Sequence, residues 1–193
     1  MLAELFHHLR EGGLVMLPIG FLALVLWWMT FLKARELLVL IRQERTPQEA
    51  LTNSEDDWQS AIAKDYLASR SGNEELDVEL ARVLVDRHAG HTKKGISTIL
   101  ILAATAPLLG LLGTVTGMVN TFEVIAQFGT GNARGLAAGI SQALITTQSG
   151  LIVAVPGMVA GSLLYRRAAK LKDRMELFLS GVERMTVSKE VHA

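Results

Sequence analysis

The sequence predicts an all-α membrane protein with three transmembrane helices and long cytoplasmic helical extensions. Three blocks contain no charged residue, namely residues 12–32, 95–122 and 135–165. A helix needs about 20 apolar residues to cross a bilayer, and each block reaches that length. The chain is also only 20% charged, whereas a soluble domain usually carries about 25% charge. The blocks are therefore predicted to be transmembrane helices 1, 2 and 3.

The first block fits an uncleaved membrane anchor better than a cleaved signal peptide. A signal peptide starts with a basic stretch, but residues 1–11 carry Glu4 and Glu11 against the single Arg10. Lys33 follows the block directly. This order of charges predicts a short periplasmic N-terminus at residues 1–11.

Lysine and arginine predict which connections stay in the cytoplasm. Both residue types are frequent in residues 33–94 and after residue 165, whereas residues 123–134 contain only Arg134. We therefore expect a cytoplasmic helical domain at 33–94, a short periplasmic connection at 123–134 and a cytoplasmic helical tail at 166–193.

The cytoplasmic segment contains three helix-start signals. They are Thr46 followed by Pro47, Ser54 before three acidic residues, and Asn73 before two glutamates, since hydroxyl, amide and acidic groups suit a helix N-terminus. In the last of these helices, an apolar face is predicted from Leu76, Leu80, Val83 and Leu84.

The tail carries an apolar seam at alternating spacings of four and three residues, which is typical of helices that pack in a bundle. An amphipathic helix lying on the membrane surface is the alternative. The seam consists of Leu164, Ala168, Leu171, Met175, Phe178, Val182 and Met185.

The second and third spans each carry a stripe of small residues on one helix face. Such stripes let membrane helices approach closely, so these faces should meet protein or water rather than lipid. The first span has no such stripe and suits a lipid-facing position. In the second span the stripe is Ala103, Pro107, Gly110, Thr114, Gly117 and Thr121, and in the third it is Gly139, Ala143, Thr146, Gly150, Ala154, Gly157 and Gly161.

The third span also contains a cluster of polar residues. At about 100° per residue, Gln142, Thr146 and Ser149 lie along one border of the stripe and Thr147 along the other. Hydroxyls often bond their own helix and small residues can serve tight packing alone, but this much polarity favours the inside of an assembly. No span contains an ionisable residue, so a partner must supply the acidic group if protons move.

Enzyme and cofactor functions have little support. The chain has no cysteine and a formal net charge of +0, which removes thiol chemistry and gives no reason to expect nucleic acid as a partner. His88 and His91 could share a metal, but a solvated helix face is the simpler interpretation. We find no phosphate-binding loop or nucleophile elbow, and we expect no enzyme activity, cofactor or metal.

The segments APLLGLLGTVTGMVNTF and GISQALITTQSGLIVAVPG resemble the ExbB/TolQ/MotA family of proton-channel motor subunits. The three-span plan favours the ExbB branch, is shared by TolQ and differs from the four spans of MotA. The resemblance implies a homopentamer in the bacterial inner membrane whose second and third spans line a pore. Inside the pore it implies a dimer of the single-span protein ExbD, whose aspartate carries protons, with TonB as a further partner.

By position, Thr114 and Thr147 match the pore threonines of the family, and Pro107 and Pro156 match its span prolines. Gln142 departs from the glutamate of many ExbB proteins, and an amide cannot take up a proton near neutral pH. The predicted pore or proton-pathway residues are Thr114, Thr147, Gln142, Thr146 and Ser149. The predicted packing and kink residues are Pro107, Gly110, Gly113, Gly117, Gly150, Pro156, Gly157 and Gly161.

The resemblance implies a subunit that, with ExbD and membrane lipid around it, uses the proton-motive force to energise TonB-dependent transport across the outer membrane. Two alternatives stay open. One is a TolQ-like subunit of the Tol-Pal envelope-maintenance system, and the other is a non-conducting membrane scaffold.

Overall fold

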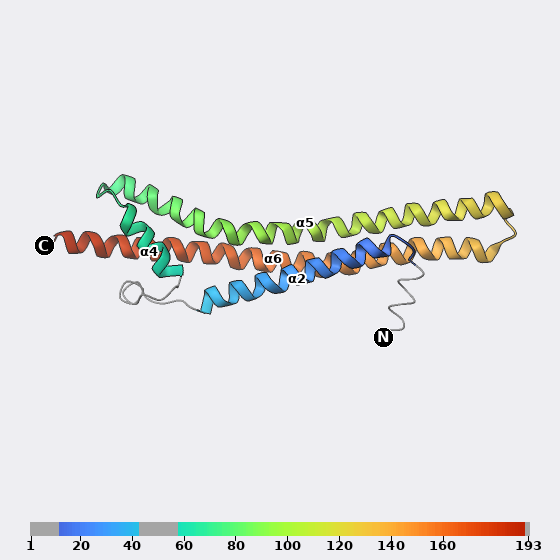
Figure 1. Ribbon diagram of the computed structural model, residues 1–193, viewed down its shortest axis with the longest axis horizontal. Helices are drawn as coiled ribbons and strands as arrows, with labels where there is room; N and C mark the ends of the chain where they lie inside the picture. The colour runs from blue at the N-terminus through green and yellow to red at the C-terminus, as the bar shows by residue number, and fades with distance from the viewer. Residues whose placement is uncertain (1–11, 43–57, 192–193) are drawn as a thin grey trace. The chain divides into compact units, whose positions relative to one another are not determined.

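The computed structural model describes residues 12–42 and 58–191, and within them every regular element is an α-helix (Figure 1). The predicted all-α fold is confirmed. The helix starts predicted at Thr46 and Ser54 lie outside the described residues. The helices are α2 (Met16–Arg42), α4 (Trp58–Ser69), α5 (Glu74–Phe128) and α6 (Ala133–Val191).

Three of these helices are long and apolar enough to cross a membrane, as the sequence predicts. The stretches that meet this criterion are Met16–Ile41, Lys93–Phe128 and Ala133–Met185. Pro107 and Pro156 both lie inside continuous helices. Because proline has no N–H group, each leaves the carbonyl four residues earlier without its usual helical partner.

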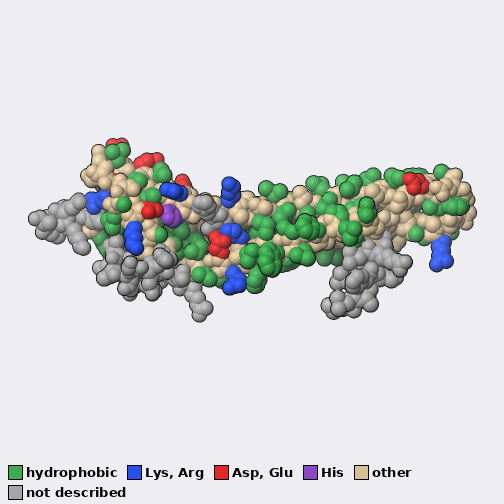
Figure 2. All heavy atoms as spheres, viewed as in Figure 1, with side chains coloured by type: hydrophobic (Ala, Val, Ile, Leu, Met, Phe, Trp, Pro, Cys, Tyr) green, Lys and Arg blue, Asp and Glu red, His purple; other side chains and the backbone are tan. Residues whose placement is uncertain are grey.

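The chain forms two compact units. The apolar unit comprises Thr98–Ser162 and the described part of Met1–Phe31, and the charged unit comprises the described parts of Leu32–Ser97 and Leu163–Ala193. Hydrophobic side chains dominate the visible face of the apolar unit, whereas acidic and basic side chains are scattered over the charged unit (Figure 2).

In the apolar unit, α5 and α6 form an antiparallel hairpin with α2 beside it. The connection is short because both helix ends are capped locally: the Gly129 N–H donates to the Ile125 carbonyl at 2.8 Å, and the Gly135 N–H donates to the Asn132 side chain at 3.1 Å. An Asn at this position satisfies a free N–H group of the first helical turn.

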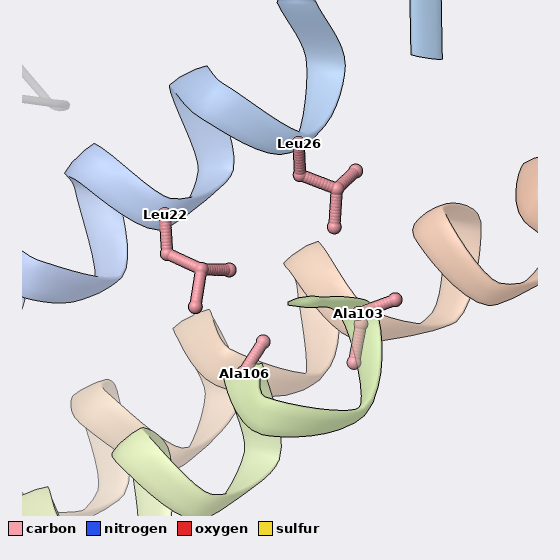
Figure 3. Packing of buried hydrophobic residues seen from close by; sticks show 5 residues of the cluster. Leu22, Leu26, Ala103 and Ala106 are labelled. Carbon is pink, nitrogen blue, oxygen red and sulfur yellow. The ribbon is translucent and has the colours of Figure 1, made fainter. Parts of the chain in front are cut away.

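The first span packs onto the hairpin through a leucine pair. Leu22 and Leu26 of α2 lie against Ala103, Ala106 and Ala154, and Figure 3 shows both leucines directed toward the two alanines of α5. Leu26 is fully buried. Elsewhere α2 exposes several large apolar side chains, including Leu17, Phe21, Leu24, Trp28 and Phe31.

In the charged unit, α4 is held by an aromatic contact at its start. The Trp58 ring meets the Phe178 ring edge-on, with centroids 5.8 Å apart, and the Trp58 indole N–H donates to the Leu40 carbonyl at 3.2 Å. The buried side chains of α4 include Ile62 and Tyr66. This helix therefore contacts both α2 and α6 within the unit.

The predicted tail seam is buried from Leu164 to Val182, with Met185 half-buried at its end. The third span continues without a break into the tail, because α6 ends only at Val191. A helix lying on a membrane surface would leave this face to lipid. The structure supports the bundle and not the surface-helix alternative.

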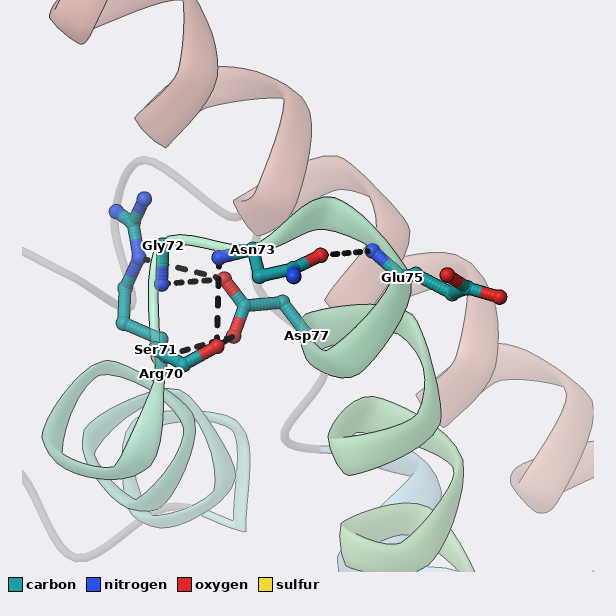
Figure 4. Close-up of polar contacts among 6 residues, drawn as sticks. All are labelled: Arg70, Ser71, Gly72, Asn73, Glu75 and Asp77. Atoms are coloured by element: carbon teal, nitrogen blue, oxygen red, sulfur yellow. Dashed lines mark hydrogen bonds and ion pairs between the residues drawn. The ribbon is translucent and has the colours of Figure 1, made fainter.

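The apolar face predicted for the start of α5 is correct in part, since Leu84 is buried and Leu80 is half-buried, but it is wrong at Leu76 and Val83. Leu76 and Val83 are 60% and 56% exposed, whereas Asp77 is only 5% exposed. The Asp77 carboxylate accepts bonds from the Ser71 N–H at 2.7 Å and the Gly72 N–H at 3.1 Å, so it fastens the turn between α4 and α5 (Figure 4). At the start of α5, the side that faces inward therefore carries this bonded carboxylate and not Leu76.

The same bonds lower the pKa of Asp77. The Ser71 N–H is the largest cause, with smaller contributions from the Ser71 hydroxyl, the Gly72 N–H and the Arg70 guanidinium, all of which favour the carboxylate. Asn73 caps α5 as predicted, since its side-chain oxygen accepts the Glu75 N–H at 3.2 Å.

Candidate functional site

The two helices of the hairpin approach so closely that their backbones are in contact. A Cβ atom on Gly150 would lie 2.7 Å from the Ala106 carbonyl oxygen, and one on Gly117 would lie 2.8 Å from the Gly139 carbonyl oxygen. Both distances are too short for a real side chain. We call this contact the seam; its buried residues are Ala103, Ala106, Gly110, Gly113, Gly117 and Thr121 of α5, with Gly139, Ala143, Thr146, Gly150, Ala154, Gly157 and Gly161 of α6.

The α5 side of the seam differs from the predicted stripe at two positions. Ala106 and Gly113 are buried in it, whereas Pro107 and Thr114 are half-buried at its edge. The contact residues follow alternating spacings of three and four, which keeps a straight row facing the partner helix. The predicted stripe contained Pro107 and Thr114, each one position after the buried residue. The sequence pattern allowed both sets of positions.

Thr146 lies inside the seam. It is fully buried, and its hydroxyl lies 3.0 Å from both the Gln142 and the Ala143 carbonyl oxygens of its own helix. Gly113 lies opposite, and a Cβ there would collide with the Thr146 side chain. Thr146 therefore packs between the two helices, with its hydroxyl bonded to carbonyl groups of its own helix.

One border of the seam, which we call the closed border, is covered by α2. Val15, Met16 and Ile19 pack against Leu109, Ile145 and Val153. Gln142 and Ser149 lie within about 60° of Ile145 on the α6 surface, so they belong to this border. A Cβ on Gly13, just before α2, would collide with the Gln142 amide nitrogen.

The opposite border, which we call the open border, carries Thr114 and Thr147. Thr114 lies about 140° around α5 from Leu109, and Thr147 lies about 120° around α6 from Val153. Both are therefore turned away from Leu109 and Val153, two of the positions that contact the start of α2, and both are half-buried. The structure thus separates the five predicted pore residues: Thr114 and Thr147 on the open border, Gln142 and Ser149 on the closed border, and Thr146 between the helices.

The hydroxyl protons on the open border are engaged by backbone carbonyls. Thr114 donates to Leu111 at 2.6 Å, and Thr147 donates to Ala143 at 3.1 Å and reaches Gly110 of the other helix at 3.4 Å. A hydroxyl has one donor and two acceptor sites. Toward a partner, these two threonines therefore present acceptor oxygens.

Asn120 is a polar residue of the site that the sequence interpretation missed. Its side-chain N–H donates to the Gln142 side-chain oxygen at 3.1 Å, which joins α5 to α6. Asn120 lies eleven residues after Leu109 and so falls about 20° from it around the helix. This position is informative only in the structure, which shows that Leu109 faces the start of α2.

Charge is almost absent from the apolar unit. Among its described residues only Glu123 and Arg134 are charged, and both are exposed near the hairpin connection. Outside this unit, His88 Nδ1 lies 3.0 Å from the Leu84 carbonyl oxygen, and His88 Nε2 lies 3.8 Å from the Asp65 carboxylate. In the described part of the chain, no three His, Asp or Glu side chains form a group that could hold a metal.

These features define a polytopic α-helical membrane protein in which two spans form a tight hairpin that bears hydroxyls and has no ionisable side chain at depth. A family model described as the MotA/TolQ/ExbB proton channel family matches residues 53–177. The chain belongs to this family.

Curated relatives come from two branches. The chain is 30% identical over 128 residues to Biopolymer transport protein exbB1 of Vibrio cholerae serotype O1, which is 66% of this chain and 56% of that protein. It is 40% identical over 81 residues to Biopolymer transport protein ExbB of Aquifex aeolicus, 42% of this chain and 55% of that one. It is 31% identical over 97 residues to Tol-Pal system protein TolQ of Pseudomonas aeruginosa, which is 50% of this chain and 42% of that protein. The chain spans about half the length of these relatives.

Proposed function

We propose that this chain is a wall subunit of an ExbB-like proton channel in the bacterial inner membrane. Together with a single-span ExbD-like protein it uses the proton-motive force, and through TonB it energises transport across the outer membrane. The observation that carries this proposal is the open border, where two half-buried threonines present acceptor oxygens on spans without an ionisable residue.

The proton then travels on an acidic side chain of the partner. A neutral carboxyl group can donate its proton to the free lone pairs of Thr114 or Thr147. A carboxylate would need the hydroxyl proton, which is already donated to the backbone carbonyl of Leu111 or Ala143. The open border therefore favours the proton-loaded carboxyl over the charged one while the partner is away from water, and this is the step that ties proton movement to movement of the partner.

The proposed assembly is a homopentamer with the open borders turned inward and α2 turned to lipid. The exposed apolar residues of α2, such as Phe21 and Trp28, suit lipid contact. With the distribution of basic residues, we place residues 1–11 and 123–134 in the periplasm. Residues 33–94 and 166–193 are placed in the cytoplasm.

The test replaces each hydroxyl by a methyl group of the same shape. Thr114→Val and Thr147→Val should each reduce TonB-dependent uptake on the order of tenfold, since a hydrogen bond to an ionisable group contributes about 1.5–3 kcal/mol. Thr116→Val is the matched control, because Thr116 bonds Leu112 and Gly113 and lies away from the open border. Wild-type uptake by both test variants at normal protein levels would refute the proposal.

A TolQ-like role is the second candidate, favoured by the similarity to the Pseudomonas aeruginosa protein. Expression of the chain in strains that lack either system separates the two roles. Restored detergent resistance without restored iron uptake supports the TolQ-like role, and the reverse result supports the ExbB-like role.

A non-conducting scaffold is the third candidate, because a small-residue seam can serve packing alone. A scaffold requires no small partner, whereas the proposed channel does. For the channel, purification followed by native mass measurement should show several copies of this chain together with a single-span protein that contains an intramembrane aspartate. A complex of this chain alone would favour the scaffold.

A further inference from the structure

The closed border contains a polar contact that joins α5 to α6 and lies against Gly13, just before α2. We infer that Asn120 is a positioning residue for Gln142, and that the two amides form a clasp that holds the start of the first span on the α5–α6 hairpin. This inference does not rest on the proposed function, because it concerns contacts within one chain.

Within the clasp, α5 and α6 are joined by an amide–amide hydrogen bond. Asn120 of α5 donates to the Gln142 side-chain oxygen of α6 at 3.1 Å. A bond of this length has the geometry of a full N–H···O hydrogen bond. It fixes the Gln142 side chain, which would otherwise have several rotamers, in one direction across the closed border.

The direction is the one that meets the start of α2. The Gln142 amide nitrogen occupies the place where a Cβ atom on Gly13 would lie. Gly13 also has a φ of 69°, a conformation that disfavours other residues. Two separate requirements, space for the amide and a left-handed backbone, therefore converge on glycine at this position.

The clasp lies beside the apolar contacts that begin the first span. The Met16 N–H donates to the Gly13 carbonyl at 3.1 Å, and Val15 and Ile19 are 8% and 2% exposed against the hairpin. Gln142 packs against Gly13, the residue whose carbonyl accepts the first bond of α2. The position of the first span over the closed border therefore depends on the contact between Gln142 and Gly13.

The clasp is neutral, and its surroundings contain few charges. The ionisable residues nearest along the helices are Glu123, one turn after Asn120, and Arg134, about two turns before Gln142; both are exposed. The described start of α2 has none. The clasp therefore keeps its hydrogen bond at every pH at which the protein is folded, and Gln142 acts through packing and not as a proton relay on the open border.

The experiment changes the amides to acids of nearly the same shape in the full chain, purified in detergent. In Asn120→Asp with Gln142→Glu, two carboxylates would face each other and would repel when both are ionised. We expect this variant to melt about 5 °C below wild type near pH 8. The difference should disappear near pH 5, because one shared proton restores a hydrogen bond. Gln142→Glu alone keeps the Asn120 donor and should change less.

Two further variants complete the test. Asn120→Gln with Gln142→Asn keeps the combined length of the pair and should melt close to wild type, whereas Asn120→Leu should melt lower. This exchange decides the question if the double acid does not fold at any pH. Gln127→Glu, at an exposed position on the same helix, is the control for adding a carboxylate.

The inference is supported if the double acid recovers on acidification and the exchanged pair restores the melting temperature. It is overturned if the double acid shows the same pH dependence as Gln127→Glu, or if the exchanged pair melts as low as Asn120→Leu. None of these measurements uses transport, so the clasp can fail while the proposed channel function holds, and the reverse is also possible.

Discussion

At the scale of single residues, the seam explains why small side chains occur where leucine would bury more surface. Lipid tails are as apolar as leucine, so membrane helices gain little from hydrophobic burial and associate through close packing. Gly117 and Gly150 meet the facing backbone directly. Any side chain at these positions would push the helices apart and move the threonines of the open border.

Gly150→Ala and Gly117→Ala should each destabilise the protein by about 1–3 kcal/mol, the usual cost of inserting a methyl group into a packed core. The measurement is thermal unfolding in detergent. Gly20→Ala is the control, since a Cβ there meets nothing within 4 Å. Alanine suits a helix better than glycine by up to about 1 kcal/mol, so this variant should be unchanged or more stable. Equal loss in all three variants would contradict the close contact.

Only part of the seam could be predicted from the sequence. The presence of a small-residue face in each span could be predicted, and Gly110, Gly117 and Gly150 lie in the seam. Gly113 was predicted as a packing residue, but the predicted stripe contained Thr114 instead, because adjacent small residues give two faces that differ by a rotation of about 100°. Only the position of the partner helix decides which face is buried.

At the scale of elements, α6 was predictable and the start of α5 was not. The seven apolar residues from Leu164 to Met185 repeat strictly, which predicts that the third span continues into the tail, as it does in α6. At the start of α5, the leucine pattern competes with a polar capping group. The bonds that Asp77 accepts from the turn have a geometric requirement that a count of apolar residues does not contain.

Asp77 also gives the charged unit a dependence on pH. Because its pKa is lowered in the folded protein, its stabilising contribution is complete above the pKa of the unfolded chain and is lost as the pH falls through the folded pKa. Asp77→Asn should therefore melt lower at neutral pH and lose part of the acid-induced decrease.

The measurement is the melting temperature of wild type and variant from neutral to acidic pH. Glu79→Gln is the control, since Glu79 is exposed on the same helix and takes no part in the turn. An Asp77→Asn variant whose melting temperature follows the wild type at every pH would show that the turn does not depend on this carboxylate.

At the scale of the whole molecule, the three charge-free blocks were sufficient to predict the class of fold. Charge is excluded from hydrocarbon at a high energetic cost, so spans leave a strong signal in sequence. Which border of the hairpin α2 covers leaves no comparable signal, because every exposed face in a membrane is apolar. The sequence already placed Gln142 and Thr147 on opposite borders of the stripe, but which of the two borders α2 covers appears only when Gly13 and the start of α2 are placed.

The central claim is that this chain forms a channel wall that conducts protons only with an acidic partner. The direct measurement is proton flux into liposomes that contain the purified complex, driven by a pH gradient and membrane potential. We expect flux with the wild type and Thr116→Val, and a loss on the order of tenfold with Thr147→Val, by the same hydrogen-bond argument. Equal flux in all three complexes, or flux from this chain without a partner, would contradict the account.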